Sequence, residues 1–315
     1  MHDSTRPYRG RFAPSPTGPL HFGSLVAAAG SYLEAHWNRG KWLVRMEDLD
    51  RPREARGASD AILRMLEAYG FEWDGQVVFQ SRRGAAYGSA LKRLEHAHAV
   101  FPCACTRREI SDSTLTVASE PIYPGTCRKG LSPGRSARAM RVRVDNAVIS
   151  FEDLLQGEVE QNLAREVGDF VVRRADGLFA YQLAVVVDDF EQGITDVVRG
   201  ADLLASTPRQ ILLQRLLGQP TPRYMHLPVA VNQYGEKLSK QTRAAPLTVA
   251  EAPIRLWQAL RFLGQEPPAE LAAGRLAEIW NWSLANWRTE RIPTRRSIWE
   301  GDAGSPRRGQ AGRND

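Results

Sequence analysis

The chain has 315 residues, 43% of them hydrophobic, which is enough for a large core in one large or two modest domains. No run of about 18 apolar residues is present and residues 1–10 lack a signal-peptide core, so the sequence excludes a membrane span and predicts a cytoplasmic protein. The formal charge of +6 favours phosphate-bearing partners only weakly. Three cysteines do not make a disulfide framework, so their grouping indicates metal binding.

The first third of the chain alternates between strand-like and helix-like segments. The predicted segments are a strand at 9–13, a helix at 22–38, a strand at 41–46 and a helix at 59–69. Pro and Gly residues between Pro14 and Pro19 interrupt the pattern as a loop. Strand and helix in alternation predict a parallel α/β sheet.

The pattern changes after a helix predicted over 85–99. A cysteine pair follows, then a loop rich in Gly, Pro and Ser over 119–136. Residues 139–144 alternate between apolar and polar side chains, as a half-exposed strand does, and strand-like runs continue to Val172. These features indicate an α+β insertion that divides the parallel sheet in the sequence.

The α/β alternation resumes with a helix predicted over 201–217 and a strand over 227–231. Beyond Ala244 only helical segments are predicted, and the Arg-, Gly- and Pro-rich stretch 291–315 is expected to be disordered. The predicted helices of this region are 248–263 and 270–285.

Residues 11–24 form a strand, a proline-pinned loop and a helix that begins near His21 and Gly23. A glycine lets the backbone approach a ligand, a helix N-terminus favours phosphate, and a histidine can donate a hydrogen bond to a phosphate oxygen. Taken alone, such a segment is more often structural than ligand binding.

A second segment, residues 229–240, is a strand that turns at Gly235 and then presents Lys237, Ser239 and Lys240. Two ammonium groups beside a hydroxyl form a mobile cationic clamp for the β and γ phosphates of a nucleotide. By itself, a Lys-Leu-Ser-Lys loop is most often a solvated turn.

Together the two segments resemble the paired signatures of the class I aminoacyl-tRNA synthetases. Residues 21–24 resemble the HIGH motif and residues 237–241 the KMSKS loop, with Ser24 in place of the second His and Gln241 in place of the last Ser. The string Arg-Phe-Ala-Pro-Ser-Pro-Thr-Gly and the stretches 45–50 and 185–202 are similar to the glutamyl branch. The resemblance covers about 9–247 and implies a Rossmann-like catalytic domain.

The resemblance also implies roles for individual residues. It assigns L-glutamate binding to Arg11, Phe12, Ala13, Pro14, Ser15, Glu47, Tyr181 and Arg199. It assigns ATP binding to His21, Gly23, Ser24 and Lys240, and catalysis to His21, Lys237 and Lys240 together with Mg²⁺. Two arginines suit a substrate with two carboxylates and disfavour glutamine. The alternative for Glu47 and Arg199 is an ordinary surface ion pair.

Cys103, Cys105 and Cys127 supply three of the four ligands that structural zinc requires. Tyr123, His96 and His98 are candidates for the fourth; the two histidines lie at i and i+2 of a predicted helix and therefore on different faces. The pattern resembles the zinc site of a small branch, the glutamyl-queuosine tRNA(Asp) synthetases, which implies Tyr123 as the ligand. Three free buried thiols are the alternative. Thr106 and Glu109 have the spacing of a capping box.

The sequence after Gln241 is short. It has room for a helical stem-contact region and none for an anticodon-binding region. The resemblance then implies tRNA-independent activation of L-glutamate and its transfer to queuosine at the wobble position of tRNA(Asp), by a monomer that grips the anticodon stem-loop. The alternatives are a short glutamyl-tRNA synthetase that charges an acceptor end, a nucleotidyltransferase for another acid, and a non-catalytic zinc module that binds RNA. The expected units are the first half of the catalytic domain (1–100), the zinc-bearing insertion (101–180), the second half with the KMSKS-like loop (181–245), the stem-contact-like region (246–290) and the tail (291–315).

Overall fold

Two groups of parallel strands meet at the centre of the computed structural model, which describes residues 6–50, 52, 54–112, 122–145, 148–238 and 244–301. The strands are β1 (Arg9–Phe12), β2 (Lys41–Met46) and β3 (Val78–Phe79) in one group, and β9 (Asp196–Gly200) and β10 (Arg223–Leu227) in the other. β2 lies between β1 and β3, and β9 pairs with β10. The predicted parallel α/β architecture is confirmed.

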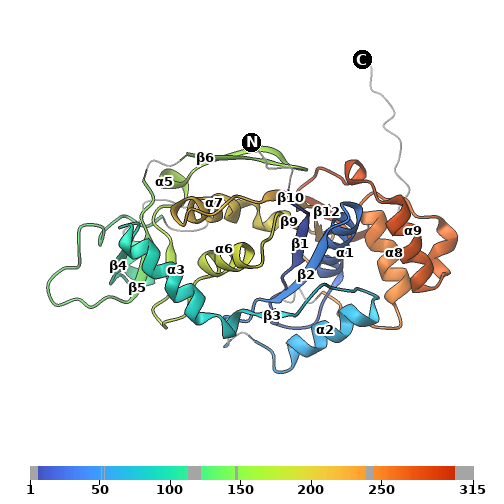
Figure 1. Cartoon of the computed structure of the whole chain (residues 1–315), viewed down its shortest axis with the longest axis horizontal. Coiled ribbons are helices and arrows are strands. Elements are labelled where there is room, and N and C mark those ends of the chain that lie inside the picture. The colour runs from blue at the N-terminus through green and yellow to red at the C-terminus, as the bar shows by residue number, and fades with distance from the viewer. Residues whose placement is uncertain are drawn as a thin grey trace, which may run out of the picture.

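β1 and β9 lie side by side where the two groups meet (Figure 1). The Thr195 N–H donates a hydrogen bond of 3.0 Å to the Arg9 carbonyl at the start of the two strands. Chain order runs from β1 to β3 on one side of this junction and from β9 to β10 on the other. In open α/β sheets, ligands bind at the carboxyl ends of the strands where the order reverses in this way.

Helices cover the sheet, and most residues of α1 are buried (Figure 1). They are α1 (Phe22–Trp37), α2 (Ala58–Ala68), α3 (Gly84–His96), α6 (Tyr181–Glu191) and α7 (Thr207–Leu216). At Gly30 a Cβ would lie only 2.6 Å from Leu227 Cδ1, so this glycine allows α1 to pack closely against β10.

The helix predicted over 201–217 is divided in the structure. A 3₁₀ segment, η3 (Ala201–Ser206), precedes α7. Pro208 in the first turn of α7 has no N–H to donate, so the α-helical ladder begins there and does not continue from the preceding segment.

The insertion contains an antiparallel sheet and a hairpin. β4 (Val100–Cys103), β5 (Ala139–Val142) and β8 (Val171–Arg173) form the sheet at one end of the elongated molecule (Figure 1). The hairpin of β6 (Val148–Asp153) and β7 (Gly157–Asn162) instead pairs with β10 through Asp153 and Tyr224. Part of the expected insertion therefore extends the sheet of the catalytic half.

Short helical segments complete the insertion and the neighbouring loops. They are η2 (Gln80–Arg82), α4 (Arg107–Asp112) and α5 (Leu163–Glu166). The capping box at the start of α4 is present: the Thr106 N–H donates to Glu109 Oε2 at 2.6 Å, and the Glu109 N–H donates to Thr106 Oγ1 at 3.2 Å.

The C-terminal part of the described chain is mainly helical. Its elements are α8 (Ala252–Phe262), η4 (Ala269–Ala273), α9 (Leu276–Asn286) and η5 (Thr289–Arg291). Both predicted helices therefore exist with shorter bounds, and the start of the second forms a separate 3₁₀ turn. No helix among the described residues is long and apolar enough to cross a membrane.

The expectation of disorder over 291–315 is wrong for part of that stretch. β12 (Ser297–Trp299) pairs in parallel with β11 (Val229–Val231), the strand that leads to the Lys237 loop. Ile292 is 3% exposed and packs in the main core, where Ile298 also contacts it. The polar composition of the whole stretch obscured these two apolar anchors; residues 302–315 lie outside the described part.

Candidate functional site

A cavity of about 490 Å³ opens at the carboxyl ends of β1 and β9. Both sequence motifs line it, although more than 200 positions separate them in the chain. The predicted site residues in its wall are Phe12, Pro14, Ser15, His21, Gly23, Ser24 and Lys237. Gly200 and Asp202 line it from the second half, and Ala13 is half-buried between two of the lining residues. The junction predicted by the sheet topology is thus where the two motifs meet.

His21 is the N-cap of α1, a role that the sequence interpretation did not include. Its Nδ1 accepts a hydrogen bond of 3.3 Å from the Ser24 N–H. A Cβ at Gly23 would lie 3.2 Å from the His21 ring, so glycine there lets the ring fold back over the helix end. Burial and the nearby Lys237 lower the pKa of His21, and Asp202 only partly opposes them. The ring is therefore neutral at pH 7, with Nδ1 as acceptor and Nε2–H as a free donor.

Lys237 pairs with Asp202 across the mouth of the cavity. The distance from Lys237 Nζ to Asp202 Oδ2 is 2.6 Å, and both side chains are partly exposed. An exposed pair of this kind is weak and can be exchanged for a phosphate oxygen. Lys240 and Gln241, also assigned from the motif, lie outside the described residues.

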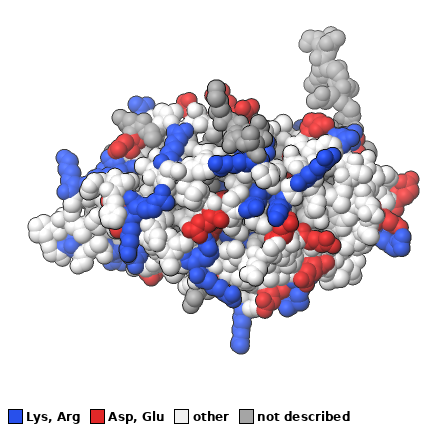
Figure 2. Space-filling model, viewed as in Figure 1, with Lys and Arg blue, Asp and Glu red and all other residues white. Residues whose placement is uncertain are grey.

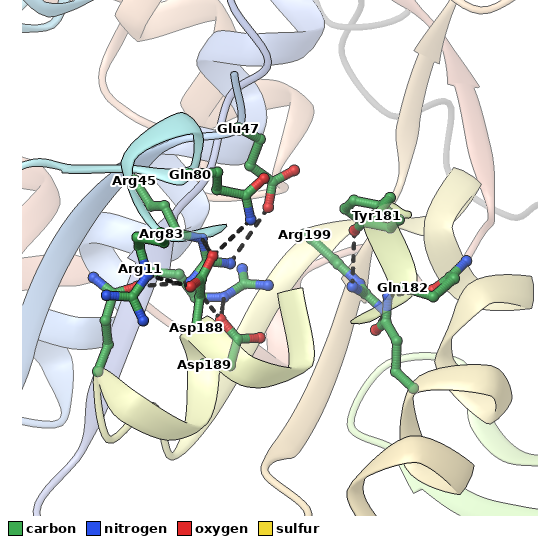
Figure 3. Close-up of polar contacts among 12 residues, drawn as sticks. Arg11, Arg45, Glu47, Gln80, Arg83, Tyr181, Gln182, Asp188, Asp189 and Arg199 are labelled. Atoms are coloured by element: carbon green, nitrogen blue, oxygen red, sulfur yellow. Dashed lines mark hydrogen bonds and ion pairs between the residues drawn. The ribbon is translucent and has the colours of Figure 1, made fainter. Parts of the chain in front are cut away.

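A cluster of arginines and carboxylates joins β1, β2 and α6 (Figure 3). Asp189 accepts from Arg11 Nε at 3.2 Å and from Arg45 Nη1 at 2.8 Å. Burial raises the pKa of Asp189, but the two guanidinium groups outweigh it and hold the pKa below its usual value. Asp189 is therefore ionised and fixes the orientation of both arginines.

Arg45 is fully buried and contacts three carboxylates, with Glu47 Oε1 at 3.3 Å from Nη2 and Asp188 Oδ2 at 3.8 Å from Nε. Burial raises the pKa of the Glu47 carboxyl, although Arg45 and Arg11 act in the opposite direction. Glu47 is thus an underpartnered carboxylate, and a substrate ammonium beside it would relieve the burial penalty. This is not the surface ion pair of the alternative interpretation.

Arg199 is 5% exposed and has only neutral direct partners among the described residues. These are His226 Nε2 at 3.1 Å, Tyr181 Oη at 3.5 Å, Thr207 Oγ1 at 2.9 Å and Gln210 Oε1 at 2.8 Å. Figure 3 shows Arg199 and Tyr181 as a second group next to the cluster of Arg11 and Glu47. The surface ion pair considered for Arg199 is wrong, because Arg199 is buried and no carboxylate pairs with it among the described residues.

Several residues of this site were not identified from the sequence. Arg45, Asp188 and Asp189 lie in stretches that resemble the glutamyl branch, but they received no role. The signal that marks them is charge in an apolar context: two aspartates directly follow the apolar run 183–187 of α6, and both are buried. His226 in the buried strand β10 carries the same signal.

The three cysteines form a cluster at the end of β4. Their sulfur atoms all lie within 4.8 Å of one another, and Cys105 Sγ is 3.6 Å from Cys127 Sγ. Tyr123 Oη lies among them, 3.5 Å from Cys103 Sγ and 3.7 Å from Cys105 Sγ. Tetrahedral zinc with Zn–S bonds of about 2.3 Å places two sulfur ligands about 3.8 Å apart. The donor set and its spacing therefore fit one zinc ion.

Arg141 contacts two residues of this cluster. Its Nε donates to Cys103 Sγ at 3.3 Å, and its guanidinium lies 4.1 Å from the centre of the Tyr123 ring. Arg141 therefore contacts both a cysteine and the tyrosine of the cluster. His96 and His98, the other candidates for a fourth ligand, are not part of the cluster among the described residues.

Figure 2 shows how charge is distributed on one face of the molecule. Lys and Arg side chains are spread across this face, and Asp and Glu side chains lie between them, mostly over the right half. The excess of positive charge among the described residues is therefore not gathered into a single patch on this face. Charge alone does not locate a surface for RNA here.

Comparisons with known proteins agree with the geometry. The family model "tRNA synthetases class I (E and Q), catalytic domain" matches residues 8–264. The chain is 62% identical to the "Glutamyl-Q tRNA(Asp) synthetase" of Dechloromonas aromatica, covering 91% of this chain and 96% of the relative. It is 57% identical to the protein of the same name from Chromobacterium violaceum, covering 91% and 95%.

Among solved structures, a glutamate tRNA ligase from Elizabethkingia meningosepticum has the same fold, with a TM-score of 0.77 and 22% identity. The match covers 95% of this chain and 68% of that one. A second structure, from Elizabethkingia anophelis, gives the same TM-score. The fold, the motif cavity and the sequence matches agree: the chain belongs to the class I tRNA synthetases of the glutamate and glutamine type and, within them, to the glutamyl-Q tRNA(Asp) synthetase family.

Proposed function

We propose that the protein activates L-glutamate with ATP, without tRNA, and transfers it to queuosine at the wobble position of tRNA(Asp). The observation that carries the amino-acid assignment is the buried Arg199, which has no carboxylate in ion-pair contact among the described residues. A buried cation without a counter-ion is costly, and a ligand carboxylate removes that cost. The tRNA assignment is supported by relatives at 57–62% identity that carry this name.

The pocket residues divide the glutamate molecule between them. Arg199 and Tyr181 hold the side-chain carboxylate, Arg11 holds the second carboxylate, and Glu47 with Ser15 receives the α-ammonium. Supporting this division, Glu47 is a buried carboxylate beside Arg11, whereas Arg199 lies in a separate group with neutral partners. Glutamine would leave the Arg199 charge uncompensated, so the pocket selects glutamate.

The reaction needs no protein nucleophile. A glutamate α-carboxylate oxygen attacks the ATP α-phosphorus, the bond to the pyrophosphate oxygen breaks, and glutamyl-adenylate and pyrophosphate form. The neutral His21 donates through Nε2 to a phosphate oxygen, while Lys237 and Lys240 attract the leaving pyrophosphate, which Mg²⁺ accompanies as part of the ATP complex. A queuosine hydroxyl then attacks the glutamyl carbonyl carbon, and AMP leaves.

We propose that Cys103, Cys105, Tyr123 and Cys127 hold one structural zinc ion, which ties the loop of the insertion to β4. The four donor atoms have the spacing that zinc requires. The site is remote from the ATP cavity in the fold, so its contribution is to stability of the insertion. We propose that the protein works as a monomer whose partner is the anticodon stem-loop.

The test is a pair of assays on the purified full chain. Exchange of labelled pyrophosphate into ATP should depend on glutamate and proceed without tRNA, with little exchange for aspartate or glutamine. Labelled glutamate should then enter tRNA(Asp) that carries queuosine and not tRNA(Asp) that lacks it. Equal labelling of both tRNAs, or labelling that survives removal of the anticodon loop, would indicate acceptor-end charging, and absence of exchange would indicate a non-catalytic RNA-binding module.

A further inference from the structure

A buried chain of hydrogen bonds links Arg199 to His226 and, through it, to Asp153. Arg199 Nε donates to His226 Nε2 at 3.1 Å, and His226 Nδ1 lies 2.6 Å from Asp153 Oδ2. The three residues are at most 5% exposed and come from β9, β10 and β6. The β6–β7 hairpin, which belongs to the insertion in sequence, is thereby connected to Arg199 through one histidine.

Asp153 is fixed in place by the backbone around it. Its Oδ1 accepts from the N–H groups of Leu155 at 3.1 Å, Gln156 at 2.9 Å and His226 at 3.2 Å. Burial raises the pKa of Asp153, but the hydrogen bond from His226 outweighs it and lowers the pKa below its usual value. Asp153 is therefore ionised, and these backbone hydrogen bonds fix its position. Its Oδ2 accepts a hydrogen bond from the protonated Nδ1 of the His226 ring.

His226 is held in one tautomer by these contacts. Burial lowers its pKa, Asp153 opposes this, and Arg199 lowers it further, so the ring is neutral at pH 7. With the proton on Nδ1, the lone pair of Nε2 accepts from Arg199. The ring thus separates the guanidinium from the Asp153 carboxylate. A direct ion pair would neutralise Arg199, whereas a neutral imidazole orients it and leaves its charge in place.

The same contacts occupy two of the three guanidinium nitrogens and leave Nη1 with a single long contact. Nε donates to His226, and Nη2 donates to both Thr207 and Gln210. Nη1 has only the long contact of 3.5 Å to the Tyr181 hydroxyl. A guanidinium has five N–H groups, so one N–H of Nη1 remains without a partner among the described residues, next to the Tyr181 hydroxyl.

We propose that His226 and Asp153 are positioning residues for Arg199. They orient Arg199 so that its Nη1 and the Tyr181 hydroxyl together receive the side-chain carboxylate of glutamate. This orientation of Arg199 sets the selectivity for glutamate over glutamine. The inference rests on the proposed function, because it concerns the pocket assigned there to glutamate. An arginine that is fixed before the substrate arrives loses less conformational entropy on binding than a mobile one.

Two substitutions at His226 test its contact with Asp153 and its contact with Arg199 separately. In His226→Asn the amide falls near the position of Nδ1, so the contact with Asp153 persists and Arg199 loses its acceptor. In His226→Gln the amide reaches the position of Nε2, so an acceptor for Arg199 is restored. Ser283→Ala is the control, since this buried residue of α9 loses one hydrogen bond, to the Ile279 carbonyl at 2.6 Å, and contacts neither Arg199 nor His226 among the described residues.

Pyrophosphate exchange is measured for each variant over ranges of glutamate, glutamine and ATP, with thermal unfolding as a control for folding. His226→Asn should raise the KM for glutamate about tenfold, as expected for a lost hydrogen bond to a charged group, and leave the KM for ATP unchanged. The preference for glutamate over glutamine in kcat/KM should fall by a similar factor. His226→Gln should recover most of this loss, and Ser283→Ala should change neither constant.

The outcomes distinguish the positioning role from the proposed function. If the native protein exchanges with glutamate but His226→Asn changes both KM values equally, or neither, the positioning role is overturned and the proposed function stands. Failure of His226→Gln to recover affinity also overturns it. If the native protein shows no glutamate-dependent exchange, the proposed function fails, and the inference fails with it.

Discussion

Replacing Glu47 by Gln separates ligand binding from stability at one residue. The substitution preserves shape and removes the negative charge that we assign to the substrate ammonium. Arg45, the present partner at 3.3 Å, keeps Asp189 at 2.8 Å and Asp188 at 3.8 Å, so no buried cation loses its only counter-ion. A hydrogen bond between charged groups contributes about 1.5–3 kcal/mol. The KM for glutamate should therefore rise about ten- to hundredfold, with that for ATP unchanged.

Stability should change in the opposite direction. The pKa of Glu47 is raised in the folded protein, so the folded state binds this proton more tightly than the unfolded state, and ionisation above the unfolded pKa opposes folding. The stabilising contribution of Glu47 is present at low pH and is lost as the pH rises through the folded pKa. Glu47→Gln should therefore unfold at the same or a higher temperature than the native protein at pH 7.

The pH dependence of activity gives an independent measurement. In the native protein, kcat/KM for glutamate should fall as the pH decreases through the raised pKa of Glu47, because the protonated carboxyl no longer attracts an ammonium. This step should be missing from the Glu47→Gln profile. Glu191→Gln is the control, since it removes the exposed one of the two carboxylates that pair with Arg83, at 2.5 Å, while Asp188 still pairs with that arginine. An unchanged KM for glutamate, or a large drop in unfolding temperature, would refute the reasoning.

Two further predictions concern the zinc cluster and the cavity mouth. Tyr123→Phe should leave three thiolates, lose zinc to a chelator faster than the native protein, and unfold at a lower temperature, as measured by metal analysis and calorimetry. Asp202→Asn should release Lys237 from its pair at 2.6 Å and lower the KM for ATP by up to about fivefold, the range of an exposed ion pair, as measured by exchange at varied ATP.

Each of these two predictions has a control substitution elsewhere in the protein. Tyr69→Phe removes a buried hydroxyl that donates to the Thr248 carbonyl at 3.0 Å and should not affect zinc retention. If Tyr123→Phe retains zinc as tightly as the native protein, the fourth ligand is another group. Asp176→Asn breaks a comparable exposed pair, with Arg174 at 2.6 Å, and should leave the KM for ATP unchanged. A higher KM for ATP in Asp202→Asn would show that Asp202 assists ATP binding.

Local features could be predicted from the sequence because the atoms that make them are close in the chain. The strand, loop and helix of residues 9–38 follow from apolar spacing and from prolines that exclude helix. The capping box of Thr106 and Glu109 involves residues three apart. The roles of Arg11, Glu47 and Arg199 came from the resemblance to a family, and the structure adds that they lie near one another, with Arg11 and Arg199 buried and Glu47 half-buried.

Only the tertiary structure decided which charges meet. Arg45 contacts Asp189 across 144 residues, and His226 contacts Asp153 across 73 residues, pairings to which neither hydrophobic periodicity nor composition is sensitive. The hairpin β6–β7 pairs with β10, and β12 pairs with β11, although the sequence analysis placed the partners in different units. These pairings could not be predicted either, because strand pairing depends on which sheet edges the assembled core leaves open. The sequence by itself determined most of the helices and strands and the motif chemistry. Folding determined which charges are compensated, and it leaves Arg199 without a carboxylate partner among the described residues.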